Sequence, residues 1–233
     1  MDAPEQRAPE PTELARRLFG PRLPLTQRYA DLLATTGISH GLVGPREAGR
    51  LWERHLVNCA LMESLLPEGS EVIDIGSGAG LPGIVLALAR PDLRVHLVEP
   101  LLRRTTWLEE TVRQLGLEQV SVHRGRADEM ELQAPVVTAR AVASLDKLVA
   151  WSFPLLPVGG RLLALKGEAA QDELEQAGDL LRRRGVTDSR LHVLGEGEEG
   201  GPVRVVEILR PPDVSRAGAG RGSAGGRRSR RTR

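Results

Sequence analysis

The spacing of apolar positions divides the chain into a helical N-terminal region and a longer region in which strands and helices alternate. In residues 12–66 apolar side chains recur at helical intervals, and the pattern ends at Pro67-Glu68-Gly69. In residues 67–210 short apolar runs are separated by amphipathic stretches. We therefore predict an N-terminal helical cap (12–66) and an α/β domain (67–210), with a flexible segment at 1–11 and a disordered tail at 211–233.

The alternating region predicts a seven-stranded sheet. The expected strands are 72–75, 94–98, 120–123, 135–139, 161–165, 190–194 and 203–209, and the expected helices are 82–90, 102–115, 145–156 and 168–184. Alternation of this kind predicts parallel strands with helices on both faces, a Rossmann-like α/β fold. Because no helix separates the last two strands, we expect them to form an antiparallel hairpin.

The first of these strands runs into a glycine-rich turn that contains Gly76, Gly78 and Gly80. Glycine tolerates positive φ and allows a ligand to approach the backbone, and Pro82 suits the first turn of the helix that follows. The turn therefore predicts a cradle for a nucleotide-type cofactor. An ordinary tight turn between a strand and a helix is the alternative for this motif taken alone.

The spacing of the glycines distinguishes two classes of cofactor. A dinucleotide fingerprint, G-x-G-x-x-G, requires a third glycine where this chain has Leu81. The pattern that is present, G-x-G-x-G preceded by Asp74 inside the strand, is typical of class I methyltransferases. We therefore expect S-adenosyl-L-methionine (SAM) as the cofactor.

Two further strand ends supply candidate cofactor-binding residues. The second strand ends at Glu99, about twenty residues beyond the glycines, where a carboxylate would accept hydrogen bonds from both ribose hydroxyls. The third strand runs into Gly125-Arg126-Ala127-Asp128, and an acidic residue at this place commonly faces the adenine amino group. Three strand ends therefore converge on one expected ligand.

Composition restricts the possible domain number, the kinds of site and the location of the protein. The chain has 233 residues, 40% hydrophobic and 27% charged, which suits one sizeable core with a small accessory element. It contains no uninterrupted apolar stretch of about 18 residues, and its acidic, proline-bearing start does not read as a signal peptide. One cysteine, Cys59, and five scattered histidines predict neither a disulfide nor a metal site. We expect a cytoplasmic protein that has no contact with membranes.

The net charge of +1 conceals an uneven distribution. Residues 216–233 contain seven arginines and no acidic residue, which leaves residues 1–215 with a net charge of −6. Such a Gly-, Ser- and Arg-rich tail cannot bury enough apolar surface to fold. It is either an electrostatic arm for RNA phosphates or a solvated terminus without a specific role.

Residues after the fourth and fifth parallel strands should face the acceptor, because ligands of such sheets bind outside the carboxyl ends of the strands. These residues are Arg140 and Lys166, and both lie next to small residues. Pairing with a surface carboxylate is the alternative for each of them. His55 is interpreted as a hydrogen-bonded core residue, because it is a single histidine on an apolar helix face.

The residues near these strand ends restrict which atoms of a base could accept the methyl group. Methylation at a pyrimidine C5 requires a thiolate, but Cys59 lies in the N-terminal region. Methylation of an adenine amino group typically uses an Asn/Asp-Pro-Pro-aromatic loop, where this chain has the segment 138–144, Thr-Ala-Arg-Ala-Val-Ala-Ser. A ring nitrogen such as guanine N7 already carries a free lone pair, so the enzyme need only align it and exclude water. A site that contains cationic side chains but no evident nucleophile or general base fits this acceptor.

Four segments together resemble the RsmG (GidB) family over residues 12–210. These are Glu53-Arg54-His55-Leu56-Val57-Asn58, the glycine loop from Ile73 to Ile84, the run from Thr138 to Leu145, and Ala164-Leu165-Lys166-Gly167. The Leu-Pro-Gly-Ile extension of the glycine loop and the Arg-Ala segment are the most specific parts. The resemblance implies a 16S rRNA methyltransferase that transfers the SAM methyl group to N7 of one guanine in the decoding-region loop.

The resemblance also implies roles for individual residues. Gly76 and Leu81 would line the methionine end of the cofactor, Ala127 and Asp128 the adenine end, and Arg140 would face the acceptor guanine. Arg126 and Lys166 would be candidates for orienting RNA or substrate. The expected partner is 16S rRNA or the small ribosomal subunit, and we expect a monomer.

Two alternatives come from other functional classes. An NAD-dependent oxidoreductase is disfavoured by Leu81 and by the expected terminal hairpin. A catalytically silent RNA-binding protein with a methyltransferase fold would bind RNA tightly but not SAM. Within the methyltransferase class, a related enzyme with a different acceptor is a further alternative.

Overall fold

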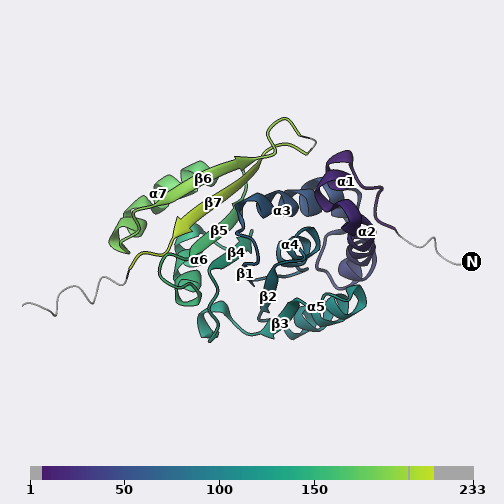
Figure 1. Cartoon of the computed structure of the whole chain (residues 1–233), viewed down its shortest axis with the longest axis horizontal. Coiled ribbons are helices and arrows are strands. Elements are labelled where there is room, and N and C mark those ends of the chain that lie inside the picture. Colours follow the sequence, from purple (N-terminus) through teal and green to yellow (C-terminus); the bar gives the residue numbers. More distant parts are fainter. Residues whose placement is uncertain (1–6, 199, 213–233) are drawn as a thin grey trace, which may run out of the picture.

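A seven-stranded sheet forms the centre of the computed structural model, which describes residues 7–198 and 200–212 (Figure 1). The strand order is β3-β2-β1-β4-β5-β7-β6. The strands are β1 (Glu71–Ile75), β2 (Arg94–Glu99), β3 (Val120–Arg124), β4 (Val136–Arg140), β5 (Arg161–Lys166), β6 (Ser189–Leu194) and β7 (Val203–Leu209). β1 to β5 are parallel, and β7 pairs antiparallel with both β5 and β6. The predicted sheet and its antiparallel hairpin are confirmed.

The two faces of the sheet are covered by different helices. The helices of the alternating region are α4 (Gly83–Ala89), α5 (Leu102–Leu115), α6 (Leu145–Ser152) and α7 (Ala170–Arg183). Successive side chains of a strand point to opposite faces, so Val72 packs with α4 and α5 whereas Ile73 packs with α6 and α7. Each face is thus sealed by its own apolar cluster.

The N-terminal region is helical, as its periodicity predicts. It contains α1 (Glu13–Phe19), α2 (Leu23–Leu32) and the short α3 (Asn58–Ala60). Other segments of the region take different helical forms: Leu33–Gly37 and Leu51–Val57 are π-helical, whereas Pro45–Arg50 and Leu61–Leu65 are 3-10 helices. Hydrophobic spacing finds such a region but does not distinguish these forms, because segments of 5 to 7 residues are too short to reveal their period.

The N-terminal helices pack on the α4 and α5 side of the sheet. Tyr29, Trp52 and Met62 are buried in the same apolar cluster as the residues of α4. The Phe19 ring meets Trp52 edge-on, with ring centroids 6.2 Å apart. The helical region and the sheet therefore share a continuous core.

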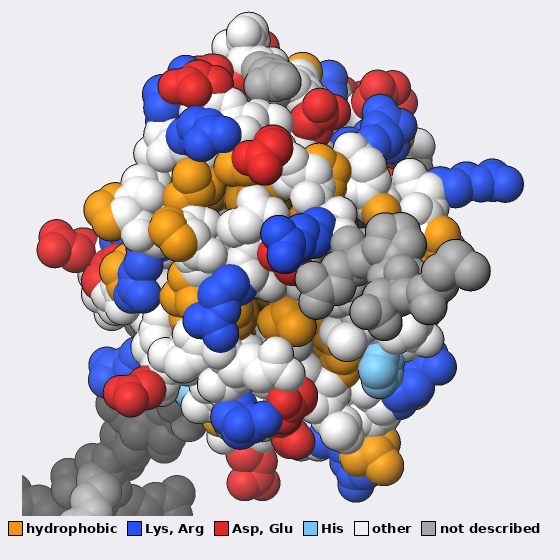
Figure 2. Space-filling model, turned by 90° about the vertical axis from the view of Figure 1, so that its right-hand side faces the viewer, with side chains coloured by type: hydrophobic (Ala, Val, Ile, Leu, Met, Phe, Trp, Pro, Cys, Tyr) orange, Lys and Arg blue, Asp and Glu red, His pale blue; other side chains and the backbone are white. Residues whose placement is uncertain are grey.

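On the outer face of this region, acidic and basic side chains are interspersed with hydrophobic ones (Figure 2).

Several predicted boundaries differ from the structure. α4 begins at Gly83, so Pro82 precedes the helix instead of lying in its first turn. The helix predicted at 145–156 ends at Ser152 and continues as a 3-10 turn, Phe153–Leu155, since Pro154 lacks the amide that an α-helix would use. Residues 1–6 and 213–233, which hold part of the predicted flexible N-terminus and nearly all of the predicted tail, lie outside the described residues.

Two features are absent from residues 7–198 and 200–212. No helix there is both long and apolar enough to cross a membrane. No three His, Cys, Asp or Glu side chains in those ranges are grouped so that they could hold a metal ion.

Candidate cofactor and acceptor site

The glycine loop between β1 and α4 depends on backbone conformations that favour glycine. Gly76, Gly78 and Gly80 have φ values of +67°, +57° and +88°. A Cβ at Gly80 would also lie 2.4 Å from the Cδ1 atom of Ile84, and a Cβ at Gly76 would lie 2.8 Å from Cγ1 of Val142. The loop is thus fixed by both its dihedral angles and its close contacts.

Asp74 supports the loop from beneath. Its carboxylate is fully buried and accepts hydrogen bonds from the Gly83 amide at 3.1 Å and from the Thr138 hydroxyl at 3.4 Å. Burial raises the pKa of this carboxyl to about 7, although these bonds and one from Ser77 act in the opposite direction. Neither Asp74 nor Gly80 lines the cavity described below, so the structure assigns both a supporting position instead of a place in the wall.

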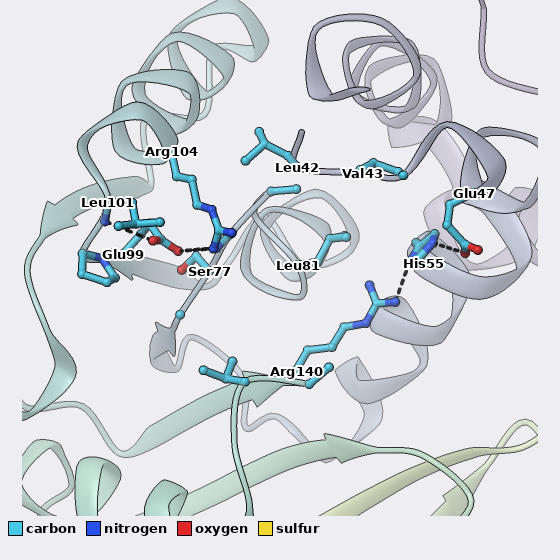
Figure 3. A pocket seen from close by; sticks show the side chains of 17 residues that line it. Leu42, Val43, Glu47, His55, Ser77, Leu81, Glu99, Leu101, Arg104 and Arg140 are labelled. Atoms are coloured by element: carbon cyan, nitrogen blue, oxygen red, sulfur yellow. Dashed lines mark hydrogen bonds and ion pairs between the residues drawn. The ribbon is translucent and has the colours of Figure 1, made fainter. Parts of the chain in front are cut away.

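A cavity of about 610 Å³ lies beyond the carboxyl ends of the strands (Figure 3). Five predicted site residues from three strand ends line it, namely Gly76, Gly78, Leu81, Glu99 and Arg140. The opposite wall comes from the N-terminal region, through the loop Leu42–Gly44 and the side chains of Glu47 and His55. The expected convergence of strand ends is therefore present, and the helical region completes the cavity.

Glu99 is held firmly at one end of this cavity. Its side chain is 2% exposed and accepts hydrogen bonds from the backbone amides of Gly78 at 3.0 Å and Leu101 at 3.1 Å. A guanidinium nitrogen of Arg104 on α5 lies 3.6 Å from the carboxylate (Figure 3). These contacts fix a carboxylate at the place where the sequence predicts a partner for ribose hydroxyls.

A second cavity, of about 120 Å³, adjoins the first. Arg126, Ala127 and Asp128 line it, while Gly76 and Val142 line both cavities. The 3-10 turn Ala127–Glu129 carries the two residues predicted for the adenine end. Arg126 pairs with Asp128 at 3.1 Å and with Glu129 at 3.7 Å. The structure thus brings together the residues predicted for both ends of the cofactor, on either side of Val142.

Arg140 crosses the floor of the larger cavity from the end of β4 towards the N-terminal region (Figure 3). Its Nη2 atom donates to the carbonyl oxygen of Arg54 at 3.2 Å and to Nδ1 of His55, and its Nη1 atom donates to Sγ of Cys59 at 3.7 Å. The guanidinium is thereby anchored at three points, and none of these partners is a carboxylate.

The sequence predicts that His55 is a core residue, whereas in the structure it lines the cavity wall. Its Nε2 atom lies 2.9 Å from a carboxylate oxygen of Glu47. Burial, together with the charge of Arg140, lowers the pKa of His55, and the hydrogen bond to Glu47 opposes this change. A neutral ring that donates from Nε2 to Glu47 and accepts at Nδ1 from Arg140 satisfies all three groups.

The structure does not bring Lys166 to the cavity. Its side chain is 7% exposed, and Nζ donates to a Glu173 carboxylate oxygen and to the Ala143 carbonyl oxygen, each at 2.7 Å. The lysine therefore joins the start of α7 to the loop after β4. The expectation that it faces the acceptor is not supported by this geometry, and the carboxylate-pairing alternative describes it.

Cys59 lies beside Arg140 but is fully buried. Burial raises the pKa of its thiol to about 11, and the charge of Arg140 only partly opposes this effect. A thiol in this state is a poor nucleophile, because the thiolate is the reactive form.

Comparison with known proteins identifies the family. The model of the GidB family, described as rRNA small subunit methyltransferase G, matches residues 22–200. A ribosomal RNA small subunit methyltransferase G of Thermobifida fusca is 56% identical over 200 residues, which cover 85% of this chain and 84% of the relative. The protein of the same name from Kineococcus radiotolerans is 48% identical and covers 94% of this chain and 92% of the relative.

A solved structure supports the fold assignment independently. A SAM-dependent methyltransferase from Aquifex aeolicus superimposes with a TM-score of 0.52 at 19% identity, over 75% of this chain and 97% of that chain. The predicted class I methyltransferase fold and the predicted cofactor SAM are confirmed by the family and the fold together. The chain belongs to the GidB family, the rRNA small subunit methyltransferases G.

Proposed function

We propose that this protein transfers the methyl group of SAM to N7 of one guanine in the decoding-region loop of 16S rRNA. The observation that carries the proposal is the anchored guanidinium of Arg140 at the cavity floor, next to a buried thiol whose pKa is about 11. Such a site can orient a base that already carries a lone pair, but it provides no activated thiolate. The names of the relatives support small-subunit rRNA as the substrate class.

The residues present fit the cofactor. The two adjoining cavities provide separate space for its methionine and adenine ends, and Gly76, which has no side chain to fill that space, lines both of them. Gly76, Gly78 and Leu81 would hold the methionine end, and the fixed carboxylate of Glu99 would accept the ribose hydroxyls. Ala127 and Asp128 would hold the adenine end.

When bound, SAM supplies a methyl group on a positively charged sulfur. The protein then has to place guanine N7 in line with that carbon and exclude water, which can account for much of the rate of a transfer between two oriented partners. Arg140 would donate hydrogen bonds to an acceptor oxygen of the base, and no proton has to be removed from N7. His55 and Glu47 would hold the guanidinium in the direction that the base requires.

The experiment that tests this function measures methyl transfer from labelled SAM. The acceptors are small-subunit particles and free 16S rRNA, both from cells that lack this protein, and chemical cleavage at 7-methylguanine then locates the label. Label at a single guanine supports the proposal. SAM binding without transfer to either acceptor contradicts the substrate, and label at a base other than guanine contradicts the N7 assignment.

Arg140→Ala tests the proposed role of the guanidinium in the same assay. We expect the rate of transfer by the folded protein to fall on the order of 100-fold, as when one donor to a reacting centre is removed, while the loss of three hydrogen bonds lowers the free energy of unfolding by about 2–4 kcal/mol. Arg94→Ala, an exposed arginine at the start of β2 and thus at the opposite edge of the sheet, is the matched control. Loss of activity that merely follows loss of folded protein would contradict the role.

A further inference from the structure

Three exposed arginines follow one another at intervals of four residues on the segment next to the cavity. Arg46 and Arg50 belong to the 3-10 helix Pro45–Arg50, and Arg54 belongs to the π-helical Leu51–Val57. We call these three residues the arginine stripe. Within the described ranges none of their side chains has an ion pair or a hydrogen bond to an acidic group.

Many other arginines on the described surface are neutralised locally. Arg17 pairs with Glu198, Arg90 with Asp92, Arg113 with Glu110, Arg161 with Glu207 and Arg190 with Asp188, at 2.6 to 3.0 Å. These ion pairs form because a carboxylate lies within reach of each of these arginines. The guanidinium groups of the arginine stripe keep their donors free for an external acceptor.

The arginine stripe belongs to the segment that forms one wall of the cavity, but its side chains do not line the cavity. Glu47 and His55, which alternate with it along the same segment, line the cavity, while Leu51 is fully buried. The backbone carbonyl of Arg54 accepts the hydrogen bond from Arg140 at 3.2 Å. The three arginines are therefore exposed neighbours of residues that line the cavity, and the last of them is one hydrogen bond away from the residue that would face the acceptor.

Two carboxylates belong to the same segment. Glu47 is hydrogen-bonded to the ring of His55, and Glu53 is half-buried beside Arg54. Three arginines therefore leave this segment with an excess of one positive charge, and Glu47 is turned to the cavity. By contrast, acidic and basic side chains are interspersed on the outer face of the N-terminal helices (Figure 2). Exposed arginines elsewhere, such as Arg94 and Arg183, also have no ion pair among the described residues, so this segment is distinguished by its place in the cavity wall and not by a large local charge.

We propose that the arginine stripe binds successive phosphates of the RNA strand that carries the acceptor base into the cavity. The planar guanidinium matches two phosphate oxygens at once, so a row of unpaired arginines suits a sugar–phosphate backbone better than a flat protein surface. The inference rests on the proposed function for the nature of the strand. It adds the path by which that strand reaches the site.

The test compares two triple variants with the same net charge in the full-length protein. Arg46→Gln/Arg50→Gln/Arg54→Gln removes the stripe. The control, Arg94→Gln/Arg183→Gln/Arg184→Gln, removes three exposed arginines at or near the amino ends of the parallel strands, away from the cavity. Binding to 16S rRNA from cells lacking this protein is measured between 0.05 and 0.3 M salt, and SAM binding is measured for both variants.

Each phosphate contact to a single strand contributes about 0.7 to the slope of log K against log salt. Loss of three contacts should therefore flatten the slope by about 2 and weaken binding about 50-fold at 0.15 M salt, with SAM binding unchanged. The control should keep the wild-type slope. Equal slopes for both variants, whether flattened or not, would overturn the proposal, because net charge and not position would then decide binding.

The same data separate this inference from the proposed function. If the wild-type protein methylates no guanine but only the stripe variant loses its salt slope, the proposed function fails and the RNA path stands. If methylation occurs at a single guanine and the stripe variant binds and reacts as the wild type does, the function stands and the path is wrong.

Discussion

The buried carboxyl of Asp74 provides a quantitative test of how the glycine loop is supported. Because burial raises its pKa to about 7, the carboxyl ionises near neutral pH in the folded chain but near pH 4 in the unfolded chain. Between these values the folded chain holds a proton that the unfolded chain has released. The free energy of unfolding should therefore fall as the pH rises from 4 to 7 and level off above that range.

A difference of about three pKa units corresponds to about 4 kcal/mol over the whole range, of which about 3 kcal/mol falls between pH 5 and pH 8. Asp74→Asn removes the titration but keeps the hydrogen bonds, since the amide oxygen can accept from the Gly83 amide and the amide nitrogen can donate to the Thr138 hydroxyl. The variant should gain about 3 kcal/mol relative to the wild type as the pH rises from 5 to 8.

Urea unfolding of both proteins at pH 5, 6, 7 and 8 measures this change, and comparison at each pH cancels the titration of all other groups. Glu109→Gln, which changes an exposed carboxyl on α5 to an amide, is the control for the loss of one negative charge. A difference between Asp74→Asn and wild type that stays constant within about 0.5 kcal/mol from pH 5 to pH 8 would refute the reasoning.

Two further predictions concern the same loop. Gly76→Ala should destabilise the fold by about 1–2 kcal/mol because Gly76 has a positive φ. It should also weaken SAM binding in a titration, because the new Cβ meets Val142. The control Gly69→Ala, at a position with φ +64° and open space around it, should show only the loss of stability. Tyr29→Phe removes the hydrogen bond at 2.6 Å to the carbonyl oxygen of Ala79, so chemical unfolding should show a loss of about 1–3 kcal/mol, and an unchanged stability would contradict this account.

Most of the fold could be predicted because the strands of this sheet are apolar in short runs. Parallel strands covered on both faces require such runs, and Val72, Ile73 and Ile75 of β1 are all buried. The antiparallel hairpin followed from the missing helix between the last two strands. The π-helical and 3-10 turns of the N-terminal region could not be predicted, since their choice depends on tertiary packing that leaves no separate signal in the apolar pattern.

Arg140 and Lys166 follow neighbouring strands, but their side chains take different directions. The rule that ligands bind beyond the carboxyl ends of parallel strands places Arg140 and Lys166 at the same edge, and the backbone of β4 and β5 confirms this. It does not determine where a long side chain turns. Arg140 extends along the cavity floor to His55, whereas the Lys166 ammonium folds back onto Glu173, which lies in the first turn of α7.

His55 was missed for a different reason. Its apolar helical neighbours place it correctly on an inward face, but its partner Arg140 is 85 residues away in the chain. Glu47, its second partner, lies on a turn whose geometry the sequence does not reveal. A contact of this kind becomes visible only when the helical region is placed against the carboxyl ends of the strands.

The helical region is therefore part of the site and not merely a cover over it. Tyr29 of α2 donates to the glycine loop at Ala79, and the carbonyl of Arg54 and the ring of His55 hold the guanidinium from β4. These contacts reach the loop that would bind the cofactor and the residue that would face the acceptor. The helices that carry these residues pack in one continuous core. A change in how they pack should therefore alter cofactor binding and acceptor alignment together.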